Sequence, residues 1–366
     1  MSEWKTTELG NVITLKRGYD LPQQKRNTGL IPIFSSSGVS GSHNTAMAKA
    51  PGVITGRYGT IGQVFYADTD FWPLNTTLYV EDFHDNDPQF IYYFLKTLAW
   101  EKFTSASAVP GINRNTVHKE IVQIPDVETQ RIIAKYLLMI DEKIKNNEQI
   151  NDNLQQQALA IFRQELLREG ELPEGWVSGS LLDIANYLNG LAMQKFRPVD
   201  GEKGLPVLKI KELRQGTCDV SSELCSPNIK PEYIVHDGDV IFSWSGSLLV
   251  DLWCGGTCGL NQHLFKVTSE KYPKWFYYAW TAHHLARFVA IAADKATTMG
   301  HIKREELANA EVVIPDSGSV ERIGGVLQPM YDLIISNRIE NHKLAMLRDT
   351  ILPQLMSGEL DVSDLT

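Results

Sequence analysis

The sequence predicts a mixed α/β protein in which two similar globular domains are joined by two long helices that form an antiparallel coiled coil. Three observations predict this class. A set of motifs recurs in the same order in both halves, short β-branched runs lie between glycines within each half, and a heptad pattern follows each half. At 366 residues the chain has room for about two domains of roughly 150 residues each.

The repeated motifs indicate an internal duplication. Trp4 corresponds to Trp176, and the later motifs match in order: Leu15–Gly18 with Tyr187–Gly190, Pro51–Thr60 with Gly238–Ser247, Leu74-Asn75 with Leu260-Asn261, Tyr92-Tyr93 with Tyr277-Tyr278, and Ile124–Asp126 with Ile314–Asp316. The offset between the copies grows from 172 residues at the first pair to 190 at the last, so the second copy contains 18 inserted residues. A shared order of several motifs predicts two copies of one fold.

The globular parts are predicted at residues 1–125 and 173–316. Short runs such as Gly52–Thr55 and Asp239–Phe242 are typical of strands between glycine turns. Apolar residues at helical spacing predict one helix over residues 87–103 and another over 275–291.

Long helices are predicted over about 127–169 and 319–356, within the segments 126–172 and 317–366. Apolar residues alternate at steps of four and three, as in a coiled-coil seam. The seam residues are Ile133, Leu137, Ile140, Ile144, Asn147, Asn151, Leu154, Ala158 and Ile161, and, 190 residues later, Ile323, Leu327, Met330, Ile334, Asn337, Asn341, Leu344, Arg348 and Ile351.

An asparagine pair lies in the middle of each seam. Asparagine in a seam fixes register, because a slipped helix leaves its amide unpaired. Antiparallel packing about a pseudo-two-fold axis predicts that Asn147 lies near Asn341, and Asn151 near Asn337. The alternative is that these amides face solvent where the seam widens.

No motif of an enzyme is present, and we expect no catalytic residues. The sequence lacks a P-loop, a dinucleotide-binding GxGxxG and the Asn-Pro-Pro-aromatic motif of amino-methyltransferases. The nine histidines are scattered, and none suggests a catalytic triad. Cys254 and Cys258 have tolerable spacing for zinc, with Cys218 and Cys225 as further ligands. Because the first copy has no cysteine, we expect free thiols and no metal.

Composition predicts a cytoplasmic protein. The sequence shows neither an apolar leader nor an apolar run long enough for a membrane span, and four cysteines are too few for a disulfide framework. We therefore expect no membrane partner.

The duplicated motifs and helices closely resemble one family, the specificity (S) subunits of type I restriction–modification systems. The resemblance covers nearly the whole chain and is carried by both copies, through Val53–Gly62, Trp72–Leu78, Gly204–Leu213, Gly238–Ser243, Gly259–Phe265 and Ile314-Pro315.

The resemblance implies a DNA-reading scaffold without catalysis of its own. Residues 1–125 and 173–316 would be target-recognition domains, each reading one half of a bipartite, asymmetric target in double-stranded DNA. The central helix, 126–172, and the C-terminal helix, 317–366, would set the gap between the halves and dock two methyltransferase subunits. Those subunits would bring S-adenosylmethionine, and restriction subunits would use ATP and magnesium. This chain itself would bind no cofactor.

Polar loop residues beside basic ones are the candidates for DNA contacts, because arginine and lysine pair with guanine or phosphate, and asparagine or glutamine with adenine. In the first copy these are Lys16, Arg17, Ser36, Arg57, Tyr58, Asn75, Asn113, Arg114 and Asn115. In the second they are Lys195, Lys209, Lys211, Ser243, Trp244, Asn261, Gln262, Lys303 and Arg304. Each of these could instead be a solvated charge, a turn residue or, for Tyr58 and Trp244, a packed aromatic.

Two alternatives remain open: a non-catalytic protein–protein adaptor with two heads on a coiled coil, and an enzyme fused to its own DNA reader. The net charge of −9 argues against DNA binding at first, because phosphate binding needs basic residues. The charge is unevenly distributed, however. Residues 1–125 are neutral, whereas the segments 126–172, 173–316 and 317–366 carry −3 each. Relative to length, the acid is thus concentrated on the helices, where a protein partner would dock.

Overall fold

The computed structural model describes the chain except residues 1–3, 105–110, 168–169, 295–300 and 363–366. The chain forms two compact units. Unit 1 consists of Met1–Lys143 and Leu344–Thr366, and unit 2 of Ile144–Lys343. Each unit therefore contains one of the predicted globular segments together with parts of both long helices.

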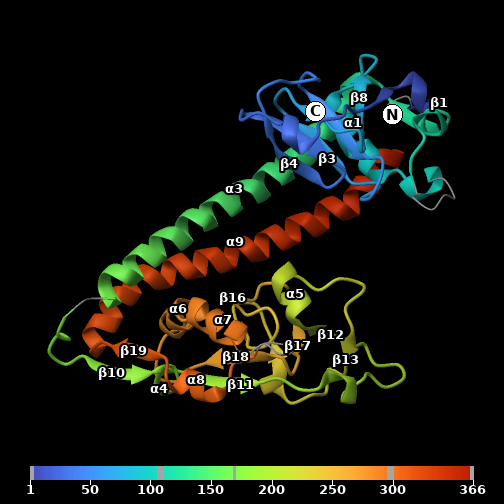
Figure 1. The fold of residues 1–366 in the computed structure, drawn as a ribbon. Coiled ribbons are helices and arrows are strands. Elements are labelled where there is room, and N and C mark those ends of the chain that lie inside the picture. The colour runs from blue at the N-terminus through green and yellow to red at the C-terminus, as the bar shows by residue number, and fades with distance from the viewer. Residues whose placement is uncertain (1–3, 105–110, 168–169, 295–300, 363–366) are drawn as a thin grey trace. The chain divides into compact units, whose positions relative to one another are not determined.

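Unit 1 contains three groups of strands and two short helices before the first long helix (Figure 1). The strands are β1 (Trp4–Glu8), β2 (Thr14–Arg17), β3 (Ile31–Ser35), β4 (Gly38–His43), β5 (Gly52–Gly56), β6 (Val64–Ala67), β7 (Trp72–Pro73), β8 (Thr77–Asp82) and β9 (Ile121–Pro125), and the short helices are α1 (Pro88–Thr97) and α2 (Arg114–Val117). The sheet orders are β2-β8-β5-β6, β4-β3-β7 and β1-β9.

Unit 2 repeats this plan with more elements. Its strands are β10 (Val177–Ser180), β11 (Asn186–Asn189), β12 (Leu205–Leu208), β13 (Leu224–Cys225), β14 (Ile234–Val235), β15 (Val240–Ser243), β16 (Leu249–Leu252), β17 (Cys258–Leu260), β18 (Leu264–Thr268) and β19 (Glu311–Ile314). Its short helices are α4 (Leu181–Ile184), α5 (Ile210–Gln215), α6 (Lys274–His283), α7 (Leu285–Asp294) and α8 (Arg304–Ala308). The orders β11-β18-β15-β16, β13-β12-β17-β14 and β10-β19 match the three groups of unit 1.

Two buried glycines show how closely the copies agree. A Cβ atom on Gly18 would lie 2.2 Å from the carbonyl oxygen of Leu74, and one on Gly190 would lie 2.2 Å from that of Asn261. Both positions need glycine because another backbone approaches closely. This contact corrects one detail of the motif alignment: Leu74 corresponds to Asn261, and Asn75 to Gln262, one residue later than the motifs suggest.

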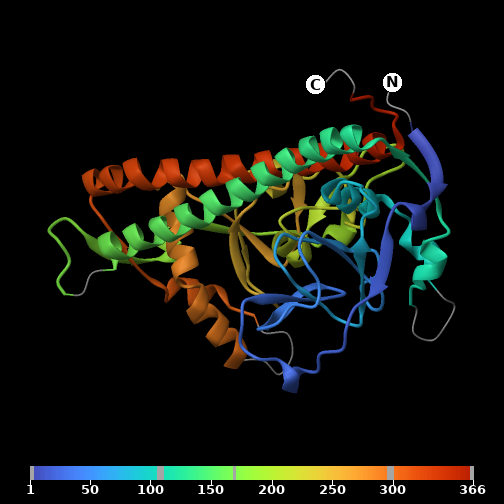
Figure 2. The same cartoon turned by 90° about the horizontal axis from the view of Figure 1, so that it is seen from above.

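The two long helices are α3 (Val127–Leu166) and α9 (Ser317–Ser357). Within unit 2 the later part of α3 lies alongside the earlier part of α9, and within unit 1 the start of α3 lies alongside the end of α9 (Figures 1 and 2). The prediction of a mixed α/β fold with two long, antiparallel helices is confirmed. Helix α9 is continuous although Pro329 and Pro353 lie inside it.

The seam asparagines meet inside unit 2. Asn147 Nδ2 donates to Asn341 Oδ1 at 2.8 Å, and Asn337 Nδ2 donates to Asn151 Oδ1 at 2.9 Å. Asn147 and Asn151 are 1% and 5% exposed. These contacts confirm the pairing predicted from the seam. Asn147 and Asn151 do not face solvent, so the alternative is wrong for them.

Seam residues also belong to the cores of the units. In unit 2, Ala158 and Leu327 pack in one apolar cluster with Phe276 and Phe288 of the helices α6 and α7. In unit 1, Ile133 and Leu137 pack in a cluster with residues of β2, β8 and α1. The helices are therefore held by the globular parts as well as by each other.

The two predicted medium-length helices are each broken, which corrects the prediction. Helix α1 ends at Thr97, and a separate 3-10 turn follows over Trp100–Phe103. The indole of Trp100 donates to the carbonyl oxygen of Leu95 at 2.8 Å, which folds the chain back on α1. The equivalent segment of unit 2 forms α6 and α7, with His284 between them. None of the described helices has the length and apolar character needed to cross a membrane.

Candidate nucleic-acid interface

A hollow of about 360 Å³ in unit 1 brings together five of the predicted DNA contacts. Lys16 and Arg17 lie on β2, Arg57 follows β5, and Asn113 and Arg114 begin α2. Leu78 and Ile112 complete the lining. Residues almost 100 positions apart thus converge on one hollow beside strand β2.

Arg57 is held in the hollow by contacts with its own strand end and with the segment before α2. Its Nε donates to the carbonyl oxygen of Ile112 at 3.2 Å, and its guanidinium carbon lies 4.5 Å from the centre of the Tyr58 ring. The Ile112 amide donates in return to the Arg57 carbonyl at 3.1 Å. The segment around Gly111 and Ile112 therefore fixes a half-buried guanidinium in place.

The other cations of the hollow differ in how they are paired. Lys16 Nζ lies 2.5 Å from Glu81, and this hydrogen bond raises the pKa of Lys16. Arg17 and Arg114 are exposed, and Arg114 makes only a long contact of 3.5 Å to the Leu15 carbonyl. Among the described residues, no carboxylate forms an ion pair with Arg17, Arg57 or Arg114. The hollow therefore carries uncompensated positive charge.

The remaining candidates of unit 1 have more local roles. Asn113 caps α2 by accepting a hydrogen bond from the Asn115 amide at 3.0 Å, and Asn115 is exposed. The Asn75 amide donates to Asp20. Tyr58 supports Arg57 and packs against Gly111, where a Cβ would come within 2.2 Å of its ring. Ser36 lies beside Gly56 and Gly59.

Unit 2 has the same backbone arrangement with different side chains. The Ile302 amide donates to the Trp244 carbonyl at 3.1 Å, as Ile112 does to Arg57. Trp244 thus takes the place of Arg57, and Asn189 takes that of Arg17. The indole Nε1 of Trp244 donates to Asn189 Oδ1 at 3.0 Å, and its ring lies 5.8 Å from that of Phe265. Lys303 and Arg304, at the start of α8, are both exposed.

The other candidates of unit 2 are less available. Ser243 is 0% exposed, and its hydroxyl donates to the Ser245 carbonyl at 3.2 Å. Asn261 is 6% exposed, so neither residue offers its side chain to a ligand in this conformation. Lys209 and Lys211 bind Glu223 at 2.5 Å and Asp219 at 3.7 Å. Gln262 contacts the ring of His263, and Lys195 is exposed.

Three residues of unit 2 escaped the sequence reasoning. Asn189 holds Trp244, whereas His263 and His301 place their rings 6.1 and 6.3 Å from the indole. The duplication carried a usable signal for Asn189, because it aligns with Arg17. Nothing in the local sequence indicates that the two histidines lie against Trp244.

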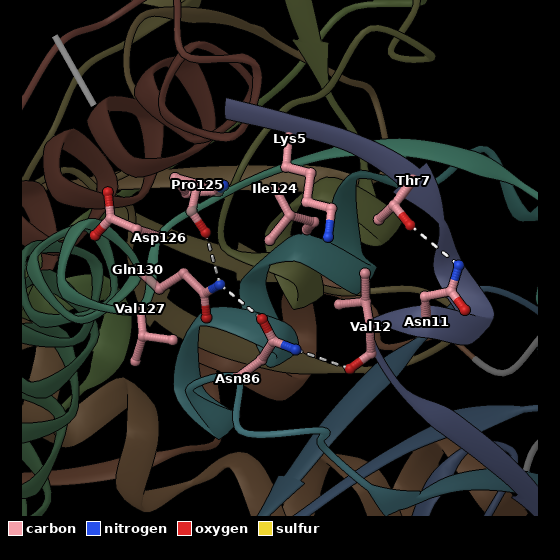
Figure 3. A pocket seen from close by; sticks show the side chains of 10 residues that line it. All are labelled: Lys5, Thr7, Asn11, Val12, Asn86, Ile124, Pro125, Asp126, Val127 and Gln130. Carbon is pink, nitrogen blue, oxygen red and sulfur yellow. Dashed lines mark hydrogen bonds between the residues drawn. The ribbon is translucent and has the colours of Figure 1, made fainter. Parts of the chain in front are cut away.

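A second hollow of unit 1, of about 500 Å³, lies where the strand pair β1-β9 meets the start of α3 (Figure 3). Gln130, 1% exposed, donates to Asn86 Oδ1 at 2.8 Å and to the Pro125 carbonyl at 3.0 Å. Asn86 donates in turn to the Val12 carbonyl at 2.9 Å. Asp126 caps the helix, and its hydrogen bonds from Thr129 lower its pKa. These bonds fix the first turn of α3 to the sheet.

The cysteines of unit 2 are free thiols in the structure. Cys225, Cys254 and Cys258 are buried, and burial raises the pKa of Cys254 to about 11. Within the described residues, no three histidine, cysteine or acidic side chains are grouped so as to hold a metal ion.

Two copies of one α/β fold, with different side chains at the same surface position and a shared pair of long helices, define a two-headed recognition scaffold. A family model described as type I restriction modification DNA specificity domain matches residues 1–156 and 173–345. The chain belongs to this family, as its motifs predict.

Two curated relatives and one solved structure agree. The chain is 23% identical to the type I restriction enzyme MjaIX specificity subunit of Methanocaldococcus jannaschii, over 76% of this chain and 70% of that protein. It is 20% identical to the HindI specificity subunit of Haemophilus influenzae, over 98% of this chain and all of that protein. The crystal structure of the S subunit from M. genitalium shares the fold, with a TM-score of 0.67, 16% identity, and 97% of this chain and 96% of that chain covered.

Proposed function

We propose that this chain is the DNA specificity subunit of a type I restriction–modification complex, with each unit reading one half of a bipartite, asymmetric target. The duplicated fold with diverged surface residues is the observation that carries the proposal. Arg57 in one unit and Trp244 in the other occupy the same backbone position, so the surfaces of the two units have diverged and the units would not recognise the same half-site. A symmetric dimer of one unit could read only a palindrome.

The chain itself would contribute recognition and no catalysis. Two methyltransferase subunits would dock on the helices α3 and α9 and bring S-adenosylmethionine, and restriction subunits would bring ATP and magnesium. Relative to length, the acidic residues are concentrated on the two helical segments, which supports a protein partner there. The cytoplasm, where DNA is accessible, is the proposed location.

Methylation mapping tests the proposal. Cells that carry this chain with its methyltransferase partner should methylate one split motif on both strands, and cells without this chain should lose that methylation completely. Exchanging residues 173–316 for the equivalent segment of another family member should change one half of the motif only. A motif that is unchanged after the exchange contradicts the assignment of one half-site to each unit.

The alternative function is a protein–protein adaptor. An open, largely apolar hollow of about 580 Å³ in unit 2, lined by Tyr272, Trp275, Pro315 and their neighbours at the start of α9, is the observation that favours it. Binding of duplex DNA in the presence of the methyltransferase separates the two functions, because an adaptor would show no sequence preference.

A further inference from the structure

We infer that the hollow formed by Arg17, Arg57 and Arg114 in unit 1 binds a phosphodiester oxyanion of the DNA backbone and does not read a base. The inference rests on the proposed function and goes further by assigning a chemical target to these residues. It also assigns this phosphate contact to unit 1, because the equivalent position of unit 2 has neutral side chains in place of Arg17 and Arg57.

Charge is the first argument. Three guanidinium groups surround a hollow of about 360 Å³, and no described carboxylate pairs with any of them. Lys16 is different, because it binds Glu81 at 2.5 Å. Arginines that no acidic partner neutralises attract an anion, and the anion that duplex DNA presents on its surface is the phosphate.

The position of Arg57 is the second argument. Its Nε is bound to Ile112 and one face of the guanidinium covers Tyr58, so the group is held within the hollow. To read guanine, arginine must extend to the floor of the major groove. A guanidinium that is fixed in place and half-buried can instead bind a group that projects outward from the DNA, as phosphate oxygens do. Its two Nη groups have no acceptor among the described residues and match an oxyanion bidentately.

Unit 2 supplies an internal comparison. Trp244 replaces Arg57 on the same backbone, and its indole packs on Phe265, which takes the place of Leu78 in the hollow. Asn189, in place of Arg17, is occupied by the indole N–H. In unit 2 a neutral pair joined by a hydrogen bond therefore replaces Arg17 and Arg57. Among the described residues that correspond to the lining of the hollow, Lys303 and Arg304 carry positive charge.

The test is the salt dependence of duplex binding by the full chain in the presence of its methyltransferase partner. Binding of a fluorescent duplex is measured between 50 and 250 mM potassium chloride, concentrations on the order of those over which counterion release is resolved. Each of Arg17→Ala, Arg57→Ala and Arg114→Ala should reduce the slope of log K against log salt by about 1, equally for every DNA sequence. Arg57→Lys keeps the charge and should keep the slope.

A control variant isolates the hollow. Lys49→Ala removes an exposed cation of unit 1 that does not line the hollow, and it should leave the slope unchanged. Thermal melting of every variant shows whether the fold is retained. If Arg57→Ala unfolds, Arg57→Lys still tests whether positive charge at this position sets the slope.

Three outcomes overturn the inference. Unchanged slopes for all three alanine variants exclude phosphate contacts, and a loss of affinity confined to one base position assigns the residue to base reading. Binding of inorganic phosphate that depends on Arg57, without any change in the DNA slope, would assign the hollow to a free anion. A fourth outcome, a wild-type chain that binds no duplex at any salt concentration in the presence of its methyltransferase partner, overturns the proposed function as well, so the two failures are distinguishable.

Discussion

Gly324 and Gly325 are neighbours in α9, but a side chain added at each would have different effects on the stability of the fold. A Cβ atom on Gly324 would lie 2.8 Å from the indole nitrogen of Trp275, which is 1% exposed, whereas a Cβ on Gly325 would meet nothing within 4 Å. Both glycines weaken the helix through backbone entropy, but only Gly324 is required by packing.

We expect Gly325→Ala to raise the free energy of unfolding by about 1 kcal/mol, because alanine favours the helix. Gly324→Ala should lower it by about 1–3 kcal/mol, since the buried indole cannot move aside. Urea unfolding of the two variants measures both effects. Equal effects at the two positions would show that Trp275 does not pack on α9 as described.

His284 makes the stability of unit 2 depend on pH. Burial lowers the pKa of His284, and its Nε2 donates to the Glu311 carbonyl at 2.8 Å. The unfolded chain binds a proton near the ordinary histidine pKa of about 6.5, whereas the folded chain does so only at lower pH. Stability is therefore present above that value and is lost as the pH falls below it.

His284→Gln, which keeps an N–H donor, should flatten the decline of the urea midpoint between about pH 7.5 and 5.5, on either side of the ordinary histidine pKa. His236→Gln changes an exposed histidine of the same unit and serves as the control. An unchanged decline in the His284 variant would assign the pH dependence to other groups, of which His283 beside it is the first to examine.

At the scale of elements, the two ends of the helix pair differ at one equivalent position. In unit 1, Asp141 accepts hydrogen bonds from Arg348 at 2.6 Å and from the Tyr93 hydroxyl at 2.6 Å. In unit 2 the equivalents of Asp141 and Arg348, 190 residues away, are Tyr331 and Ala158. There the Tyr331 ring lies 5.2 Å from that of Tyr278.

This difference selects the pairing of α3 with α9. If α3 paired with another α3 in the same register, Asp141 would face Ala158, and a half-buried carboxylate would lose its partner. Pairing α9 with itself would leave Arg348 opposite Tyr331. The ion pair therefore acts as a specificity device for the helix pair, as polar seam residues do in other coiled coils.

We expect Arg348→Ala alone to lower the free energy of unfolding by about 2 kcal/mol, because it leaves Asp141 without its charge partner. Adding Asp141→Tyr, which reproduces the arrangement of unit 2, should recover about half of the loss or more. A double-mutant cycle by urea unfolding measures the coupling. Additive single effects would mean that the pair does not contribute to selectivity.

For the whole molecule, we expect the paired helices to act as a spacer for the two readers. Inserting seven residues after Lys143 and seven after Leu344 preserves the heptads and keeps the seam positions opposite each other. Seven helical residues span about 10 Å, which corresponds to about three base pairs of duplex.

The gap of the methylated motif should lengthen by about three base pairs, with both half-sites unchanged. Methylation mapping of DNA from cells carrying the variant reads out the gap. Insertion into α3 alone is the control: it shifts the seam, leaves the asparagines without their partners, and should destabilise the chain. An unchanged gap in the double insertion would rule out a spacer role.

The sequence alone determined the duplication, the long helices and the asparagine pairs. The heptads and the repeated motifs are patterns of short stretches of sequence, so they can be recognised without the tertiary structure. The sequence also singled out Lys16, Arg17, Arg57, Asn113 and Arg114, which the structure brings to one hollow, because basic and amide residues cluster in short segments. Their contacts with DNA stay a prediction.

Tertiary structure decided what depends on distant segments. The burial of Ser243 and the support of Arg57 by Ile112 depend on contacts between parts of the chain that local sequence does not relate. The pairing of Arg348 with Asp141 across 207 positions is of the same kind. Sequence periodicity specifies which face of an element is buried, whereas the partner on that face is fixed only when the elements pack.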